Sequence, residues 1–144
     1  MGVSLGGALS LGVGWFLARL AIRERRREQA AALLGPAWRI LQESDPDSLW
    51  VLAGGDPERA KRHAQEVWRR WRDVQDSLAT VALLSPAEGA ERLGTLKTAV
   101  SFSIEAARQA MRADASADER SNARRLYGEA AAAMDEARRV VLGD

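Results

Sequence analysis

Two features of the sequence carry residue types that enzymes use for nucleophilic or acid–base chemistry: a serine between glycines at residues 2–6, and His63. The segment GVSLG has the letters of the G-x-S-x-G turn, which holds a nucleophilic serine between a strand and a helix. That turn needs a preceding strand and a downstream acid and histidine, whereas residues 2–6 open an apolar run without strand alternation. We therefore interpret the match as coincidental.

His63 does not by itself form a metal site. Zinc sites usually draw on several histidine or cysteine ligands, and this chain has one histidine and no cysteine. On the helix expected from residue 56 onward, His63 falls about 50° from the centre of the apolar face, which predicts a half-buried edge residue. A pH-sensing role is an open alternative. We expect no catalytic group, no metal and no cofactor, and therefore no enzymatic activity.

One side of the helix expected over residues 56–84 is basic. Its four arginines are Arg59, Arg62, Arg69 and Arg70. Such a face suits anionic lipid headgroups, an acidic partner or nucleic acid. The plainer interpretation is a solvated face, because acidic residues four positions away, such as Glu66 for Arg70, pair with most of the charge. Nucleic acid is the least favoured ligand, since no aromatic stacking surface accompanies the arginines and the 21 basic and 20 acidic residues nearly cancel.

Five tryptophans are present. Trp71 lies on the apolar face of its helix, and Trp15 falls near the end of the N-terminal apolar run. The other three are Trp38, Trp50 and Trp68. We expect these three to cover the open side of a helical bundle. If they are partly exposed, they would instead form an aromatic anchor for a protein partner.

The apolar run at residues 1–22 contains a single charge, Arg19, and is long enough as a helix to cross a hydrocarbon core of about 30 Å. We predict a transmembrane anchor over this range. Its large apolar residues are Val3, Leu5, Leu9, Leu11, Val13, Phe16, Leu17, Leu20 and Ile22. The basic juxtamembrane segment 23–28 follows at once. Its arginines, which set the topology, are Arg23, Arg25, Arg26 and Arg27. By the positive-inside rule they place the N-terminus outside and the C-terminal domain in the cytoplasm.

Other interpretations of residues 1–22 fit less well. A cleavable signal peptide carries its positive charge before the apolar run, an interfacial helix has a broad polar face, and N-myristoylation requires Ser or Thr where this chain has Gly6. Small residues recur every fourth position. They are Gly2, Gly6, Ser10, Gly14 and Ala18. This stripe favours pairing with a second membrane helix. The glycines also make the run only moderately apolar, so the sequence leaves open whether it spans a bilayer alone.

The remaining residues predict helices and no sustained strand. Local start signals occur at Asp56-Pro57, Ser85-Pro86 and Ser116-Ala117, each with a glutamate in the first turn. Apolar residues repeat at spacings of three and four after each signal, which predicts a three-helix antiparallel bundle over 56–144. Residues 29–55 are expected to be an irregular helical segment packing on this bundle, broken or kinked at Gly35-Pro36. An intermolecular coiled coil is the alternative arrangement.

The sequence thus predicts an all-α protein: a single-pass transmembrane helix followed by a small antiparallel bundle. We expect a non-enzymatic interaction or scaffold protein that presents this bundle at the cytoplasmic face of a membrane, with a protein partner or a second copy of the chain. The first alternative is a reader of anionic lipid headgroups through the basic face. The second is a nucleic-acid-associated membrane protein. Nothing in the sequence identifies the partner, the biological process or the oligomeric state.

Overall fold

A computed structural model of the chain describes residues 2–84 and 87–142, with the side chains of residues 2–10 and of a few later positions, Arg26 among them, outside the described set. Within these ranges the chain forms five helices: α1 (Gly2–Glu43), α2 (Pro46–Gly55), α3 (Pro57–Leu84), α4 (Ala87–Ala110) and α5 (Ala117–Leu142). No strand occurs in this part of the chain. The predicted all-α class is confirmed.

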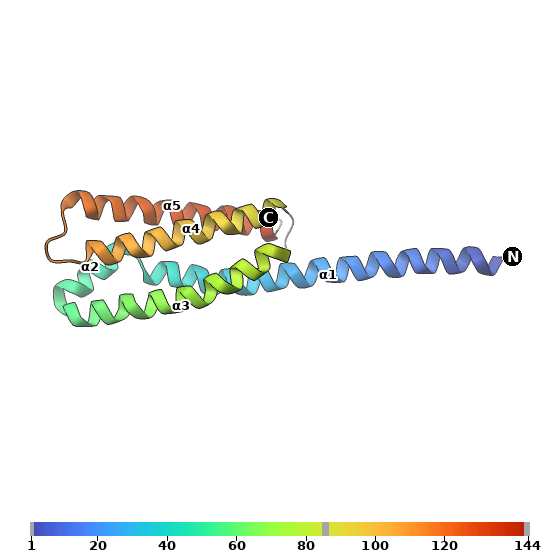
Figure 1. Cartoon of the computed structure of the whole chain (residues 1–144), viewed down its shortest axis with the longest axis horizontal. Coiled ribbons are helices and arrows are strands. Elements are labelled where there is room, and N and C mark those ends of the chain that lie inside the picture. The colour runs from blue at the N-terminus through green and yellow to red at the C-terminus, as the bar shows by residue number, and fades with distance from the viewer. Residues whose placement is uncertain (1, 85–86, 143–144) are drawn as a thin grey trace.

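Four of the helices lie side by side in an antiparallel bundle (Figure 1). The C-terminal half of α1 packs against α3 and α5, and α4 lies between α3 and α5. The short α2 closes one end of the bundle, here called the distal end. The N-terminal half of α1 projects from the opposite, proximal end (Figure 1). Within the segment 29–55, residues 29–43 belong to α1 and form one wall of the bundle, and residues 46–55 form α2.

The core is built from the apolar faces that the sequence periodicity indicated. In α3 the buried apolar residues are Ala60, Ala64, Val67, Trp71 and Leu78. In α4 they are Leu93, Leu96, Val100, Ile104, Ala107 and Ala110. In α5 they are Ala123, Ala130, Met134 and Ala137, and α1 adds Leu34, Ala37, Ile40 and Leu41. The many alanines let α4 and α5 approach closely, while the larger residues of α1 and α3 fill the space between the two helix pairs.

Capping residues explain where three of the helices begin. Asp45 accepts a hydrogen bond from the backbone N–H of Asp47 at 3.1 Å, and Asp56 accepts one from Arg59 at the same distance. At the start of α5, the N–H of Glu119 donates to Ser116 Oγ at 3.1 Å, and Glu119 Oε1 accepts from the N–H of Ser116 at 3.4 Å. These contacts satisfy N–H groups that have no partner inside a helix. The signal at Ser85-Pro86 lies outside the described residues.

Helix α1 continues through Gly35-Pro36, where the sequence predicted a break or kink. Proline removes one N–H donor and crowds the carbonyl four residues earlier, which belongs to Ala32. Both Ala32 and Pro36 face solvent, so water can take the place of the missing donor. Leu34, Ala37 and Leu41 are buried on the other side of the helix and hold it in place. The bundle thereby keeps a proline-containing helix unbroken.

Candidate interaction surfaces

The projecting half of α1 is an apolar helix in open solvent. Every described residue from 11 to 25 is exposed. The predicted anchor residues Leu11, Val13, Phe16, Leu17, Leu20 and Ile22 have between 39% and 77% of their surface accessible. The side chains of Val3, Leu5 and Leu9 lie outside the described set. Within the described residues, no helix is both long enough and apolar enough to cross a bilayer.

The predicted pairing stripe is described only in part. Gly2, Gly6 and Ser10 lie outside the described side chains, whereas Gly14 and Ala18 fall in the exposed stretch of α1. A Cβ added at Gly14 would meet no heavy atom within 4 Å. This side of the helix therefore has room for the backbone of another helix.

Two of the four arginines of the basic face are paired with carboxylates of the protein. Arg59 and Arg62 are exposed, but Arg69 donates to Glu66 at 2.8 Å and Arg70 forms an ion pair with Glu43 of α1. The hydrogen bond and the charge of Glu66 together raise the pKa of Arg69 above its ordinary value. The expected Glu66–Arg70 pair is thus replaced by two others.

Arg70, Glu43 and His63 meet where α1 ends against α3. His63 Nε2 lies 3.1 Å from the backbone oxygen of Glu43, one of the carbonyls that the end of α1 leaves without an intrahelical donor. His63 is half-buried, as its helical position predicted. No group of three or more histidine, cysteine or carboxylate residues able to hold a metal occurs in the described part of the chain. We assign this cluster a structural role, which is to join α1 to α3.

Two of the three tryptophans in the expected aromatic anchor, Trp38 and Trp68, are partly buried and pack against the core. Trp50 of α2 is also half-buried, and its ring lies under the guanidinium groups of Arg124 at 4.9 Å and Arg120 at 5.7 Å. These cation–π contacts attach α2 to α5. The three rings lie on three different helices.

A groove at the distal end was not foreseen from the sequence. It has a volume of about 570 Å³ and lies between the first turns of α3 and the last turns of α4, with Ala53 of α2 at one side. Its floor includes Ala60, Ala64 and Met111. The sequence did contain a signal: the apolar residues of α3 shrink from Trp71 to two alanines toward its N-terminus. The small residues indicate a groove only once the structure shows that α4 does not fill the space beside them.

These surfaces carry no recognised catalytic motif within the described part of the chain. The GVSLG segment lies in the first turns of α1, and a continuous helix does not have the strand-to-helix elbow that exposes a nucleophilic serine. Compared with known proteins, the chain matches no family model, no curated protein and no solved structure. Its function is therefore inferred from its own geometry.

Proposed function

We propose that this chain is a membrane-anchored, non-enzymatic interaction protein whose helical bundle recruits or organises a protein partner at the inner face of a membrane. The observation that carries the proposal is the exposed apolar surface of α1 over residues 11–22, which continues directly into a bundle with its own buried core. A contiguous apolar surface of this kind marks a contact with lipid or with another protein.

The large apolar side chains of this segment contribute modestly to insertion into lipid. Each large aliphatic residue or phenylalanine contributes about −0.3 to −0.6 kcal/mol at the centre of a bilayer. The six described here, from Leu11 to Ile22, together give about −2 to −4 kcal/mol before the penalties for glycine and Arg19. Arg19 lies within a turn of the basic segment, so its aliphatic stem can extend to the headgroups. Because this gain is small even before the penalties, pairing along Gly14 and Ala18 with a second membrane helix would support the anchor.

The arginines that follow the span give the proposed orientation. Arg23 and Arg25 are exposed immediately after Ile22, and by the positive-inside rule this supports a cytoplasmic position for the bundle. Between Ile22 and Glu43, α1 rises about 30 Å as a continuous helix. The distal end of the bundle is then held well above the headgroups, where a cytoplasmic partner can reach it.

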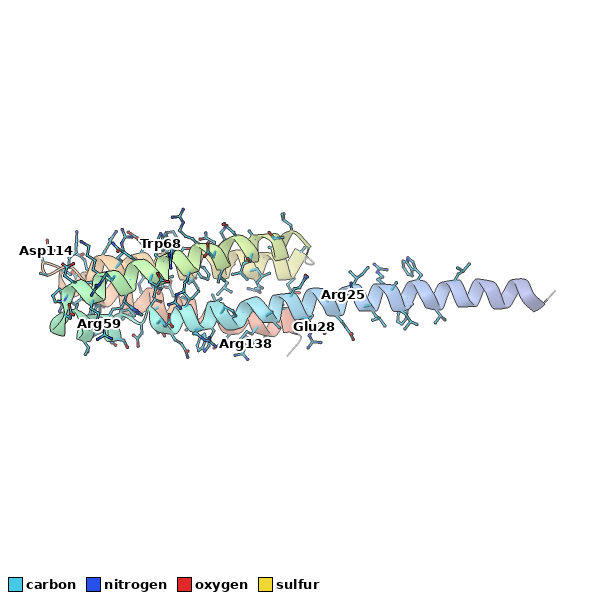
Figure 2. The ribbon with its side chains drawn as sticks, turned by 90° about the horizontal axis from the view of Figure 1, so that it is seen from below. Arg25, Glu28, Arg59, Trp68, Asp114 and Arg138 are labelled. Atoms are coloured by element: carbon cyan, nitrogen blue, oxygen red, sulfur yellow. The ribbon has the colours of Figure 1, made fainter. Side chains whose placement is uncertain are left out.

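This geometry gives less support to a reader of anionic lipids. Figure 2 shows Arg59 at the distal end and Arg25 where α1 leaves the bundle, so the basic residues at the start of α3 lie far from the proposed bilayer. Arg69 and Arg70 are also paired within the protein. The same pairing weakens the case for nucleic acid.

Membrane fractionation tests the anchor with two matched sets of substitutions in the full chain. The test set is Val13→Asn, Phe16→Asn and Leu17→Asn, at exposed positions of α1. The control set is Val51→Asn, Phe102→Asn and Leu83→Asn, which changes the same residue types at exposed positions of the bundle. After an alkaline carbonate wash, the control should stay in the membrane pellet and the test set should move to the supernatant. Retention of both sets in the pellet would refute anchoring through α1.

Orientation is tested separately. The chain has no cysteine, so Ser121→Cys at an exposed site of α5 gives a single reactive thiol. An impermeant maleimide should label it in inside-out vesicles and leave it unlabelled in right-side-out ones. The reverse pattern would overturn the cytoplasmic placement. Crosslinking from membranes followed by mass spectrometry then identifies the partner.

A further inference from the structure

The distal groove runs along the line where α3 and α4 should meet but do not fill the space between them. On α3 it is lined by Pro57, Ala60, Lys61 and Ala64, and on α4 by Glu105, Arg108 and Gln109, with Arg112 in the turn that follows α4. The residues on each helix follow spacings of three and four, so each helix presents one face to the groove. The groove is open to solvent, and its volume of about 570 Å³ is in the range of ligand sites.

Side-chain size explains why the groove forms here. Nearer the middle of the bundle, Trp71 is fully buried and its Nε1 donates to Ser101 Oγ at 2.9 Å, which joins α3 to α4. Two and three turns earlier in α3, Ala64 and Ala60 present single methyl groups. The α4 residues that line the groove are polar, and two of them, Arg108 and Gln109, are exposed. Large apolar side chains supplied from outside would fill this space and cover the accessible surface of Met111, Pro57 and Ala53.

The groove is lined by three basic side chains, Lys61, Arg108 and Arg112, and by two acidic ones, Glu58 and Glu105, so its charge balance favours an acidic occupant. Arg112 forms an ion pair with Glu119 at 2.9 Å. The ion pair of Arg108 with Glu105 is longer, at 4.0 Å, and both of its side chains are about half exposed. Lys61 is exposed and forms no ion pair among the described residues. Lys61 and Arg108 therefore line opposite walls of the groove with charge that a carboxylate can still pair with.

We infer that the groove binds an amphipathic helical segment of a partner protein, which inserts bulky apolar side chains between α3 and α4 and places carboxylates against Lys61 and Arg108. Two facing helices accept a third helix through ridges packing into grooves, in the mode by which amphipathic helices dock on helical proteins. The inference rests on the proposed function, because it assigns the partner contact of that interaction protein to one site.

The test is a titration of the full chain in phosphatidylcholine nanodiscs, followed through ¹³C-labelled methionine methyl groups. The chain has three methionines. Met111 lines the groove, whereas Met134 is fully buried in the core and serves as an internal reference. The probe is a synthetic peptide of about 18 residues, long enough to form helix, with leucines at spacings of three and four and glutamates beside them. A second peptide carries lysine in place of each glutamate.

The glutamate peptide should shift the Met111 signal saturably and leave that of Met134 in place. Reversing the rim with Lys61→Glu and Arg108→Glu should weaken its binding about tenfold and improve binding of the lysine peptide. The matched control, Arg72→Glu with Arg138→Glu, reverses two exposed arginines outside the groove and should bind like the unmodified chain.

Several results would overturn the inference. One is a Met111 signal that does not respond, and another is equal binding of the two peptides. A third is saturation by dodecanoate that the glutamate peptide cannot displace, which would make the groove a fatty-acid site. These outcomes leave the membrane fractionation result untouched. Conversely, retention of the test set in the membrane pellet would refute the anchor without affecting the Met111 titration.

Discussion

The hydrogen bond between Trp71 and Ser101 allows a quantitative test of how α3 is joined to α4. Trp71 is fully buried, its Nε1 donates to Ser101 Oγ at 2.9 Å, and Ser101 Oγ donates to the Lys97 carbonyl at 2.7 Å. Ser101→Ala removes the acceptor and leaves the indole N–H inside the protein without a partner. An unsatisfied buried donor costs about 1–3 kcal/mol. Alanine recovers a few tenths of a kcal/mol through its better helix propensity, so the net loss should be about 1–2 kcal/mol.

A double-mutant cycle isolates this hydrogen bond. Trp71→Phe removes the N–H donor together with part of the ring, and should destabilise the bundle by about 2–3 kcal/mol, less than full truncation to alanine. In the Trp71→Phe variant, Ser101→Ala should hardly change the free energy of unfolding, because no indole N–H remains that could lose its acceptor. The coupling energy should therefore be about 1–2 kcal/mol.

The assay is urea unfolding of the full chain in a mild non-ionic detergent, followed by far-UV circular dichroism. The unfolding midpoint should change while the dependence on urea stays constant, which indicates a change of stability at constant buried surface. An equal effect of Ser101→Ala in the unmodified chain and in the Trp71→Phe variant would refute the hydrogen bond as the source of the loss.

Three further outcomes are expected. Burial of Tyr127, and secondly the charge of Asp45, raise the pKa of its hydroxyl above 10.0. The neutral tyrosine therefore stabilises the folded chain below the pKa that Tyr127 has when unfolded, and this stability is lost as the pH rises through the pKa of the folded state. The tyrosinate absorbance should therefore appear at a higher pH in the folded chain than in the urea-unfolded chain, and identical titration curves would contradict this. Tyr127→Phe should reduce the loss of unfolding free energy at alkaline pH. Asp56→Ala should cost about 1 kcal/mol by uncapping α3, whereas Asp56→Asn should keep most of that stability; equal losses would exclude the cap. Glu43→Gln should cost about 0.5–1 kcal/mol in unfolding free energy, more than Glu66→Gln, because the Glu43–Arg70 pair is less exposed than Glu66–Arg69; the opposite ranking would contradict this.

Local signals in the sequence predicted the starts of α3 and α5. Asp56 and Ser116 satisfy N–H groups within three residues of themselves, so no knowledge of the tertiary fold is needed to recognise them. The apolar spacings of α3, α4 and α5 predicted most of the core for a similar reason, since helical periodicity fixes which residues share a face.

Features that depend on packing between distant segments were not predicted. The unbroken path of α1 through Pro36 depends on which side of the helix faces solvent, and the pairing of Arg70 with Glu43 joins residues 27 positions apart. The groove depends on the separation of α3 and α4, which the alanines permit without specifying. A sequence pattern gives the faces of helices but not the gaps between them.

The continuity of α1 from its projecting half into the bundle also fixes a rotational phase. Because the helix turns about 100° and rises 1.5 Å per residue, the angle between the Gly14 side of the projecting half and each face of the bundle is set by residue count alone. One residue inserted between Ile22 and Leu34 would swing the groove by more than a quarter turn about the helix axis, whereas seven would bring it almost back into register at a greater height. The length of this helix therefore determines the direction in which the groove points.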